Sequence, residues 1–220
     1  GLMGVGIAHA FASSGHDVRL IDVSSELLAK AEKTIAGILA DGVRLGKVEE
    51  TAASAALARL TTFGGVTDGA AGADLLVETV SENLAIKIDV VRKAEAVMAP
   101  TGLLATNTSA LSVTEIAAAC QDPTRVIGMH FFNPVQKMKL VELVRGLATT
   151  DEAVALCRDY VAQLGKTAIV VNETPGLTTS RMSAMAGNEA MWMLQEGAAT
   201  AEDIDTALRL GFNHPMGPLE

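Results

Sequence analysis

The sequence predicts an α/β fold in which a doubly wound, mostly parallel sheet is followed by a mainly helical second domain. Apolar runs typical of strands alternate with helical stretches up to residue 172, and such alternation builds a parallel sheet covered by helices. Apolar residues make up 49% of the chain and aromatic residues only 3%, as expected when aliphatic helices pack on a buried sheet. From Leu177 onward only helical periodicity remains.

The first elements are a helix, a turn and a strand. Apolar residues share one helical face over residues 2–13, and Gly15 is placed to end this helix before the strand-like run HDVRLID. A long helix is expected over residues 25–45, with one of the two serines at its start as the N-cap. A second helix is expected over residues 48–59. We expect these two helices to protrude as a pair.

Strand-like runs then recur along the chain, separated mainly by helical stretches. They cover residues 60–63, 74–79, 103–107, 126–132, 139–144 and 167–171, and a further helix is expected over residues 151–164. This order predicts parallel strands joined by right-handed crossovers. The carboxyl ends of such strands meet at one edge of the sheet, where open α/β folds bind their ligands.

The segment NETPG at residues 172–176 separates the two predicted domains. The first is expected over residues 1–172, with the helical pair inserted near residues 25–59, and the second over residues 173–220. Its apolar stripe is expected to be core or subunit interface, because methionines at helical spacing are more often core than a cofactor site; the stripe consists of Met182, Met185, Met191 and Met193. We also expect the central first strand to precede Gly1 and the second domain to be truncated.

Charge and cysteine usage exclude several classes of function. A net charge of −9 without a run of Lys or Arg argues against a nucleic-acid or anionic-membrane partner. Cys120 and Cys157 lie in helix-like stretches without a CxxC pattern or neighbouring histidines, so we expect buried thiols and neither a disulfide nor a metal site. No apolar run reaches the roughly 18 residues of a membrane span, and no signal segment opens the chain. The expected location is the cytoplasm.

The first residues carry part of a phosphate-binding motif. Gly1 and Gly4 fit the second and third glycines of the G-x-G-x-x-G loop of Rossmann-like domains. There, backbone N–H groups and a helix N-terminus approach a pyrophosphate. Asp22 ends the next strand at the spacing where an acid binds the ribose 2′-OH, which favours NAD over NADP. The alternative is a tight turn with a helix-capping aspartate.

Two further residues predict acid–base chemistry. The segment GMHFFNP places His130 at the end of an apolar strand, and Glu142 lies within the apolar run LVEL, where an unpaired carboxylate would be costly. If a neighbouring strand brings the two together, the carboxylate fixes the imidazole tautomer and stabilises the imidazolium, so the other ring nitrogen accepts a hydroxyl proton. A satisfied core histidine beside a structural glutamate is the alternative, and the spacing does not decide between them.

The segment TNTSALS places Asn107, Thr108 and Ser109 just after another strand, at the same carboxyl edge of the sheet. Ser109 is suited to hydrogen-bond a substrate oxygen. The alternative is a loop that only caps the next helix, for which Ser112 is a good N-cap candidate.

Six segments taken together resemble the 3-hydroxyacyl-CoA dehydrogenase family, in family order and over essentially the whole chain: GLMGVGIA, SENLAIK, TNTSALS, GMHFFNPVQKMKLVEL, NETPG and LGFNHPMGPLE. The resemblance implies a reversible, NAD-dependent oxidation of (S)-3-hydroxyacyl-CoA to 3-ketoacyl-CoA in fatty-acid metabolism (β-oxidation) or butanoate metabolism. It further implies a short-chain substrate such as 3-hydroxybutyryl-CoA and a homodimer formed through the helical domain.

The resemblance also assigns roles to individual residues. His130 becomes the general base with Glu142 as its partner, and Ser109 and Asn133 contact the substrate or the nicotinamide region and complete the catalytic set. The implied contacts with NAD are Gly1, Leu2, Met3, Gly4, Asp22, Glu82, Lys87, Ser109 and Asn133. The implied substrate contacts are Ser109, Ser180, Arg44 and Lys47.

Two departures from the family pattern bear on these assignments. Ser180 stands where the family usually has an asparagine before arginine, and a shorter hydroxyl then replaces an amide that helps to position the reacting group. In the helical pair, Ile38 and Leu45 stand where the family offers serine and lysine to CoA, which leaves Arg44 and Lys47 to serve its phosphates.

Two rival functions remain open from the sequence. One is a sister dehydrogenase that acts on a free hydroxy acid such as a sugar acid or carnitine. The other is a catalytically weak paralogue that binds NAD or acyl-CoA without turnover, for which Ser180 and the altered CoA surface are the only support.

Overall fold

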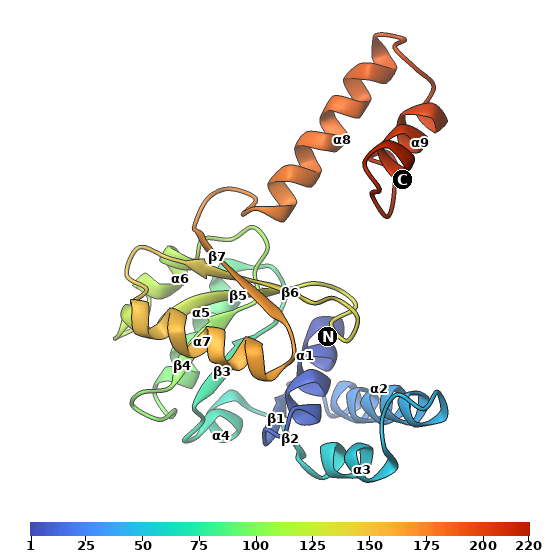
Figure 1. The fold of residues 1–220 in the computed structure, drawn as a ribbon. Coiled ribbons are helices and arrows are strands. Elements are labelled where there is room, and N and C mark those ends of the chain that lie inside the picture. The colour runs from blue at the N-terminus through green and yellow to red at the C-terminus, as the bar shows by residue number, and fades with distance from the viewer. The chain divides into compact units, whose positions relative to one another are not determined.

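The computed structural model describes residues 1–220, and the chain divides into two compact units, Gly1–Glu173 and Thr174–Glu220 (Figure 1). The strands all belong to the first unit: β1 (Val18–Ile21), β2 (Leu60–Phe63), β3 (Leu75–Glu78), β4 (Leu103–Thr106), β5 (Val126–Phe131), β6 (Leu140–Arg145) and β7 (Thr167–Asn172). Its helices are α1 (Leu2–Ser13), α2 (Ser25–Arg44), α3 (Glu50–Ala58), α4 (Val66–Ala70), α5 (Leu84–Glu95), α6 (Val113–Ala118), the 3₁₀ turn Pro123–Arg125 and α7 (Asp151–Gln163). The second unit contains α8 (Thr179–Gln195) and α9 (Ala201–Gly211).

The strands form two sheets. Five of them pair in the order β3-β4-β5-β6-β7, and β1 pairs with β2. All pairings are parallel except that of β5 with β6, which is antiparallel. The predicted fold class, a mostly parallel α/β domain followed by helices, is therefore confirmed.

The antiparallel direction of β6 is the one exception in this mostly parallel sheet. Only the short loop over residues 132–139 joins β5 to β6. A parallel connection needs a crossover of a dozen or more residues, whereas antiparallel neighbours are joined by a short turn. The length of this loop therefore dictates a hairpin.

Helices cover both faces of the five-stranded sheet. Successive side chains on a strand point to opposite faces. On β5, a Cβ added at Gly128 would meet Val113 of α6, whereas the next residue, Met129, belongs to the apolar cluster that includes Cys157 of α7. Each of the two helices thus packs on its own face of β5. Burial on both faces explains why every residue of β4 and β5 is buried.

Helix α1 links the two parts of the first unit's core. Its residues Ile7 and Phe11 pack in the cluster formed with β4–β7 and α7. Its residues Ala8 and Ala12 pack instead with Ile35 of α2 and with α3. The side-by-side helices α2 and α3 are the predicted pair (Figure 1). Because α1 packs in both clusters, the position of its N-terminus is fixed relative to the sheet and to the helical pair.

The second unit leaves much of its apolar surface exposed. Met182, Met185 and Met191 of α8 are 68%, 60% and 58% exposed, and Met193 is half-buried. The methionine stripe is therefore largely exposed in this chain, and its expected role as core or subunit interface stays a prediction. None of the helices, in either unit, has the length and hydropathy required to span a membrane.

Candidate active site

The antiparallel pairing of β5 and β6 brings His130 and Glu142 directly opposite each other. The Nδ1 atom of His130 lies 2.8 Å from Oε2 of Glu142, whose side chain is fully buried. An ionised carboxylate only accepts hydrogen bonds, so Nδ1 carries the proton and Nε2 keeps its lone pair. The side chain of His130 is 10% exposed. The contact therefore engages Nδ1, leaves Nε2 outside it and hides the carboxylate.

Neighbouring groups restrict the imidazole further. The ring of Phe132 lies 4.6 Å from the imidazole, centroid to centroid, at an interplanar angle of 55°.

The side-chain oxygen of Asn107 accepts a hydrogen bond of 2.8 Å from the backbone N–H of Phe131. Asn107 thereby joins the carboxyl ends of β4 and β5 just beyond their ladder. It brings the TNTS loop and the strand that carries His130 to one place.

The loop after β4 is held by a carboxylate from the loop after β3. Glu82 accepts the hydroxyl of Thr108 and, at 3.3 Å, the backbone N–H of Ser109. Burial works to raise the pKa of Glu82, but the hydrogen bond from Thr108, the charge of Lys87 and the N–H of Ser109 outweigh it, so the pKa lies below its ordinary value. Glu82 is therefore ionised at neutral pH. Ser109 itself is exposed at this edge.

A buried ion pair lies directly behind Glu82. The Nζ atom of Lys87, in α5, lies 3.0 Å from both carboxylate oxygens of Glu78 and 3.2 Å from Oε2 of Glu82. The side chains of Lys87 and Glu78 have no exposed surface, whereas that of Glu82 is 40% exposed. A molecule on the surface here would meet Glu82 first. Sequence reasoning expected Lys87 at the cofactor. The structure places the side chain of Lys87 behind Glu82, without exposed surface.

The start of α1 has the features of a pyrophosphate cradle. Gly1 is its N-cap and supplies no side-chain cap, and no acidic residue lies in the first turn, so the first N–H groups are free to bind an anion. A Cβ at Gly4 would lie 2.9 Å from Oγ1 of Thr79, and one at Gly6 2.8 Å from Cγ2 of Val135. These glycines let the helix end approach both the end of β3 and the loop after β5. The residues present thus fit a bound dinucleotide.

Asp22 lies directly after β1, as predicted. Its Oδ1 accepts the N–H of Ser24 at 3.0 Å, and Ser24 in turn caps α2 by accepting the N–H of Leu27 at 3.3 Å. The alternative of a tight turn at Asp22 is therefore correct in part: Asp22 stabilises a turn, but the N-cap of α2 is Ser24. The carboxylate has a second oxygen that this turn does not use.

The remaining predicted contacts lie in different places. Asn133 is exposed directly after Phe132, beside the catalytic edge. Arg44 forms an exposed ion pair of 2.9 Å with Asp41 at the end of α2, and Lys47 is exposed in the loop that follows. Ser180 is half-buried in α8 of the second unit.

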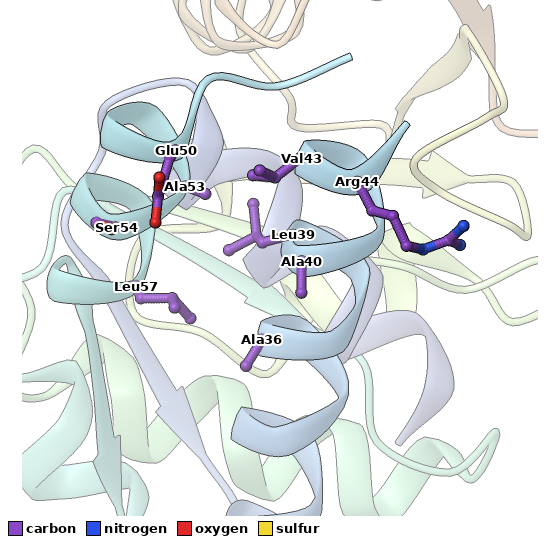
Figure 2. Close-up of a pocket in the computed structure, with 9 residues that line it drawn as sticks. All are labelled: Ala36, Leu39, Ala40, Val43, Arg44, Glu50, Ala53, Ser54 and Leu57. Atoms are coloured by element: carbon purple, nitrogen blue, oxygen red, sulfur yellow. The ribbon is translucent and has the colours of Figure 1, made fainter. Parts of the chain in front are cut away.

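The helical pair also encloses a groove. A cavity of about 370 Å³ lies between α2 and α3. Its lining is mostly aliphatic, from Ala36, Leu39, Ala40, Val43, Ala53 and Leu57, with Glu50, Ser54 and Arg44 at its edge. Figure 2 shows the guanidinium of Arg44 directed away from the other lining residues. The charge of Arg44 therefore faces solvent and not the groove.

Neither cysteine is suited to act as a nucleophile. Burial raises the pKa of the Cys157 thiol to about 12. Burial, with a smaller effect from the charge of Glu95, raises the pKa of Cys120 to about 11. The reactive thiolate is therefore scarce at neutral pH. Cys157 is buried as expected, whereas Cys120 is half-buried, which corrects the expectation of two buried thiols.

Sequence reasoning missed two residues that build this site and one contact of a third. Glu78 lies in the apolar run DLLVET without being singled out, although a carboxylate in such a run signals a buried partner. Gly6 lies outside the dinucleotide motif, and only the close approach of Val135 explains it. Asn107 was recognised as a loop residue, but the spacing gives no sign of its bond to Phe131.

Comparisons with known proteins agree with this geometry. Residues 1–174 match the family model described as 3-hydroxyacyl-CoA dehydrogenase, NAD binding domain, and residues 176–220 match that of the C-terminal domain of the same family. A probable 3-hydroxybutyryl-CoA dehydrogenase of Bacillus subtilis (strain 168) is 41% identical over all of this chain and 76% of its own length. The mitochondrial hydroxyacyl-coenzyme A dehydrogenase of Homo sapiens is 37% identical over all of this chain and 72% of its own length.

A solved structure is similar over the same extent. The crystal structure of (S)-3-hydroxybutyryl-CoA dehydrogenase PaaH1 from Ralstonia eutropha superposes with a TM-score of 0.95 at 39% identity, covering all of this chain and 77% of that one. The family models cover both units, and the likeness extends through the strands that carry His130 and Glu142. The chain therefore belongs to the 3-hydroxyacyl-CoA dehydrogenase family and is an NAD-dependent oxidoreductase.

Proposed function

We propose that this chain oxidises the 3-hydroxyl group of short-chain (S)-3-hydroxyacyl-CoA, such as 3-hydroxybutyryl-CoA, to the 3-ketone in a reversible reaction. The observation that carries the proposal is the 2.8 Å contact between Nδ1 of His130 and the buried carboxylate of Glu142. It leaves one imidazole nitrogen free as a base at the carboxyl edge of the sheet. The NAD-binding domain of the family supplies the place for the second reactant.

The proposed roles follow from where each group lies. His130 takes the hydroxyl proton on Nε2, and Glu142 stabilises the imidazolium that results. Ser109 and Asn133, exposed at the same edge, hydrogen-bond the substrate oxygen or the nicotinamide region. A bound NAD⁺ would supply the acceptor for the hydride that leaves C3 of the substrate.

The cofactor is assigned to the residues around α1. The free N–H groups of residues 1–4, meaning Gly1, Leu2, Met3 and Gly4, bind the pyrophosphate, and Asp22 binds the adenosine ribose. Glu82 lies at the surface next to Ser109 and is assigned to the nicotinamide half. Arg44 and Lys47 are assigned to the CoA phosphates, which requires the exposed ion pair of Arg44 with Asp41 to open. Such surface pairs are worth little, so this costs about 0–1 kcal/mol.

A dimer formed through the second unit is part of the proposal. Leu210 and Phe212 at the end of α9 are 81% and 75% exposed, in addition to the methionines of α8. Large exposed apolar side chains of this kind are a common feature of interaction surfaces. The cytoplasmic location expected from the sequence stays a proposal as well, since one similar human protein is named mitochondrial.

The test is a steady-state assay that follows NADH absorbance with 3-hydroxyacyl-CoA substrates of increasing chain length. We expect the highest kcat/KM for the four-carbon substrate and none for free 3-hydroxy acids or carnitine. The His130→Gln variant serves as the inactive control. Turnover of a free hydroxy acid in preference to every thioester would assign the chain to a sister activity.

A low-turnover enzyme is the second candidate, and Ser180 is the observation that favours it. If a hydroxyl at this position orients the reacting group poorly, Ser180→Asn raises kcat while KM for NAD⁺ stays the same. An unchanged or lower kcat in this variant, with native turnover already rapid, would remove the basis for this candidate.

A further inference from the structure

A network of charged side chains runs from the interior of the first unit to the proposed active site. At its inner end, Glu78 accepts two hydrogen bonds of 3.0 Å from Nζ of Lys87. Neither side chain has any exposed surface. Removing two charges from water costs several kcal/mol per ion, and replacing such pairs with neutral residues is often no loss of stability. Stability alone therefore does not account for a buried pair at this position.

The carboxylate of Glu78 is saturated by its neighbours. Besides Lys87, it accepts the hydroxyl of Thr106 at 2.7 Å and the backbone N–H of Val80 at 2.6 Å. Thr106 is the last residue of β4 and Glu78 the last of β3. Glu78 is thus fixed at the carboxyl ends of two neighbouring strands, and the lysine ammonium that it binds has little freedom to move.

Glu82 connects this buried pair to the loop of the active site. Its Oε2 lies 3.2 Å from Nζ of Lys87, while its Oε1 accepts the hydroxyl of Thr108 and the N–H of Ser109. Thr108 in turn accepts the N–H of Leu111 at 2.8 Å, so the loop folds around its hydroxyl. One oxygen of Glu82 faces the buried cation and the other holds the loop.

We propose that Glu78 and Lys87 are positioning residues: together they hold Glu82, and through Glu82 they set the position of Ser109. The proposal rests on the role given to Ser109 under the proposed function. Lys87, whose side chain has no exposed surface, thereby acts on the reaction through Glu82. The ammonium also keeps Glu82 ionised, and only the ionised carboxylate accepts both donors of the loop without needing to donate a proton itself.

The first experiment separates positioning from stability. In the double variant Glu78→Gln/Lys87→Met, both charges are replaced by neutral side chains of similar length, so no unpaired charge is left buried. We expect Tm close to that of the native protein, but kcat lower by about 10-fold to 10²-fold, the loss that follows when a contacting group moves by up to about 1 Å. Native kcat in a double variant of native Tm would overturn the proposal.

The second experiment tests the route through Ser109. Ser109→Ala removes the hydroxyl but keeps the backbone N–H that Glu82 binds. If the buried pair works by placing Ser109, its double substitution causes little further loss of kcat in the Ser109→Ala background, because residues of one network are not additive. Multiplicative losses would show that the pair acts elsewhere and would overturn the inference while leaving the proposed function intact.

Two measurements keep the outcomes distinct. Ser109→Ala with native kcat would contradict the role of Ser109 itself, and therefore both proposals. The matched control is Asp89→Asn/Lys93→Met, which removes an ion pair of 2.7 Å on the same helix α5, where both side chains are more than half exposed. We expect native kcat, KM and Tm for this control. If the control lowers kcat as the buried variant does, the effect belongs to α5 in general and not to the pair.

Discussion

At the scale of single residues, the site depends on one buried carboxylate that faces one nearly buried imidazole. Glu142 is completely buried, and Oε2 lies 2.8 Å from Nδ1 of His130. A buried carboxylate is tolerated only when it is paired, so the two residues depend on each other. The alternative, a satisfied core histidine beside a structural glutamate, would show the same contact, and the two variants below distinguish it from a catalytic base.

Removing the base should abolish most of the turnover. We expect His130→Gln to lower kcat by about 10²-fold to 10⁴-fold, the usual contribution of a general base. The affinity for NADH, measured by fluorescence titration, should stay native, because the cradle at α1 is untouched. Unchanged turnover in this variant would rule out His130 as the base.

Removing the partner should weaken the base without removing it. In Glu142→Gln a neutral amide no longer stabilises the imidazolium and also competes as a donor for Nδ1, which favours the wrong tautomer. We expect kcat to fall while Tm and NADH affinity stay close to native. A Glu142→Gln enzyme with native kcat would show that Glu142 is structural only.

Asp22 should determine which dinucleotide is used. Its carboxylate binds a ribose hydroxyl and repels a 2′-phosphate, so kcat/KM should favour NAD⁺ over NADP⁺. Asp22→Ser should narrow this ratio, mainly by raising KM for NAD⁺. Because Asp22 also accepts the N–H of Ser24, circular dichroism of the variant checks that α2 is retained. A native enzyme that prefers NADP⁺ would contradict the assignment.

At the scale of elements, α1 is the part that depends most on small residues. It packs against the main sheet on one side and against α2 and α3 on the other. Its first turn also lies against Thr79 and Val135 at the glycine positions 4 and 6. A helix held on all these sides has little room to shift, so its N–H groups are fixed before a cofactor binds.

A methyl group at position 6 should displace this helix. In Gly6→Ala, Cβ would lie 2.8 Å from Cγ2 and 2.9 Å from Cβ of Val135. Overpacking costs about 1–3 kcal/mol, whereas alanine gains about 1 kcal/mol over glycine in a helix. We expect a lower Tm and weaker NADH binding. Adding Val135→Ala should recover both, and the absence of recovery would contradict the close packing as the cause.

Glu173 anchors the end of β7 to α6 in a way that depends on pH. It accepts the backbone N–H of Thr114 at 3.0 Å and also the Thr114 hydroxyl. Burial works to raise its pKa, but hydrogen bonds from Ser112, Thr114 and the N–H of Val113 lower it below the ordinary value. A carboxyl group whose pKa is depressed on folding stabilises the fold above its ordinary pKa of 4.5 and loses that contribution as pH falls through the folded value.

Glu173→Gln should therefore lower Tm at neutral pH by about 2–4 °C, the shift expected for about 1 kcal/mol in a chain of this size. The difference from the native protein should shrink as the pH falls below 4.5. Glu115→Gln, an exposed position on α6, is the matched control. A difference in Tm that stays constant down to low pH would argue against the ionised carboxylate as its source.

At the scale of the whole molecule, the two units differ in how much of their apolar surface they bury within themselves. The first unit has closed apolar clusters around its sheet. In the second, Ile204 and Ala190 are the only buried aliphatic side chains of α8 and α9, while large apolar side chains on both helices are exposed. Much of the apolar surface of the second unit is therefore exposed in this chain.

The proposed dimer should respond to charge placed on that surface. Leu210→Glu, at a position that is 81% exposed, should shift the protein from dimer to monomer in sedimentation velocity, because an unpaired charge in an interface is costly. Leu147→Glu, at a position of the first unit that is 92% exposed, is the control and should remain dimeric. A native protein that is monomeric at all concentrations would contradict the proposal.

The sequence predicted the elements better than it predicted their environment. Strand and helix boundaries agree within about two residues because periodicity and capping residues such as Ser112 are local signals. The pairing of His130 with Glu142 was predictable because burial demands a partner. The contact of Glu78 with Lys87 was not predictable. The two residues lie in a strand and in a helix that are separated by a turn, so no periodic spacing relates them.

The hairpin of β5 and β6 determines where this chain tolerates changes in length. Residues 132–139 link two strands whose pairing is set by the strands themselves, so insertions in the middle of this loop leave His130 and Glu142 opposite each other. One residue inserted within β6, ahead of position 142, would instead turn the carboxylate to the other face of the sheet. We therefore expect the pairing of His130 with Glu142 to survive a change in the length of this loop, but not a change in the length of the strand segments on either side.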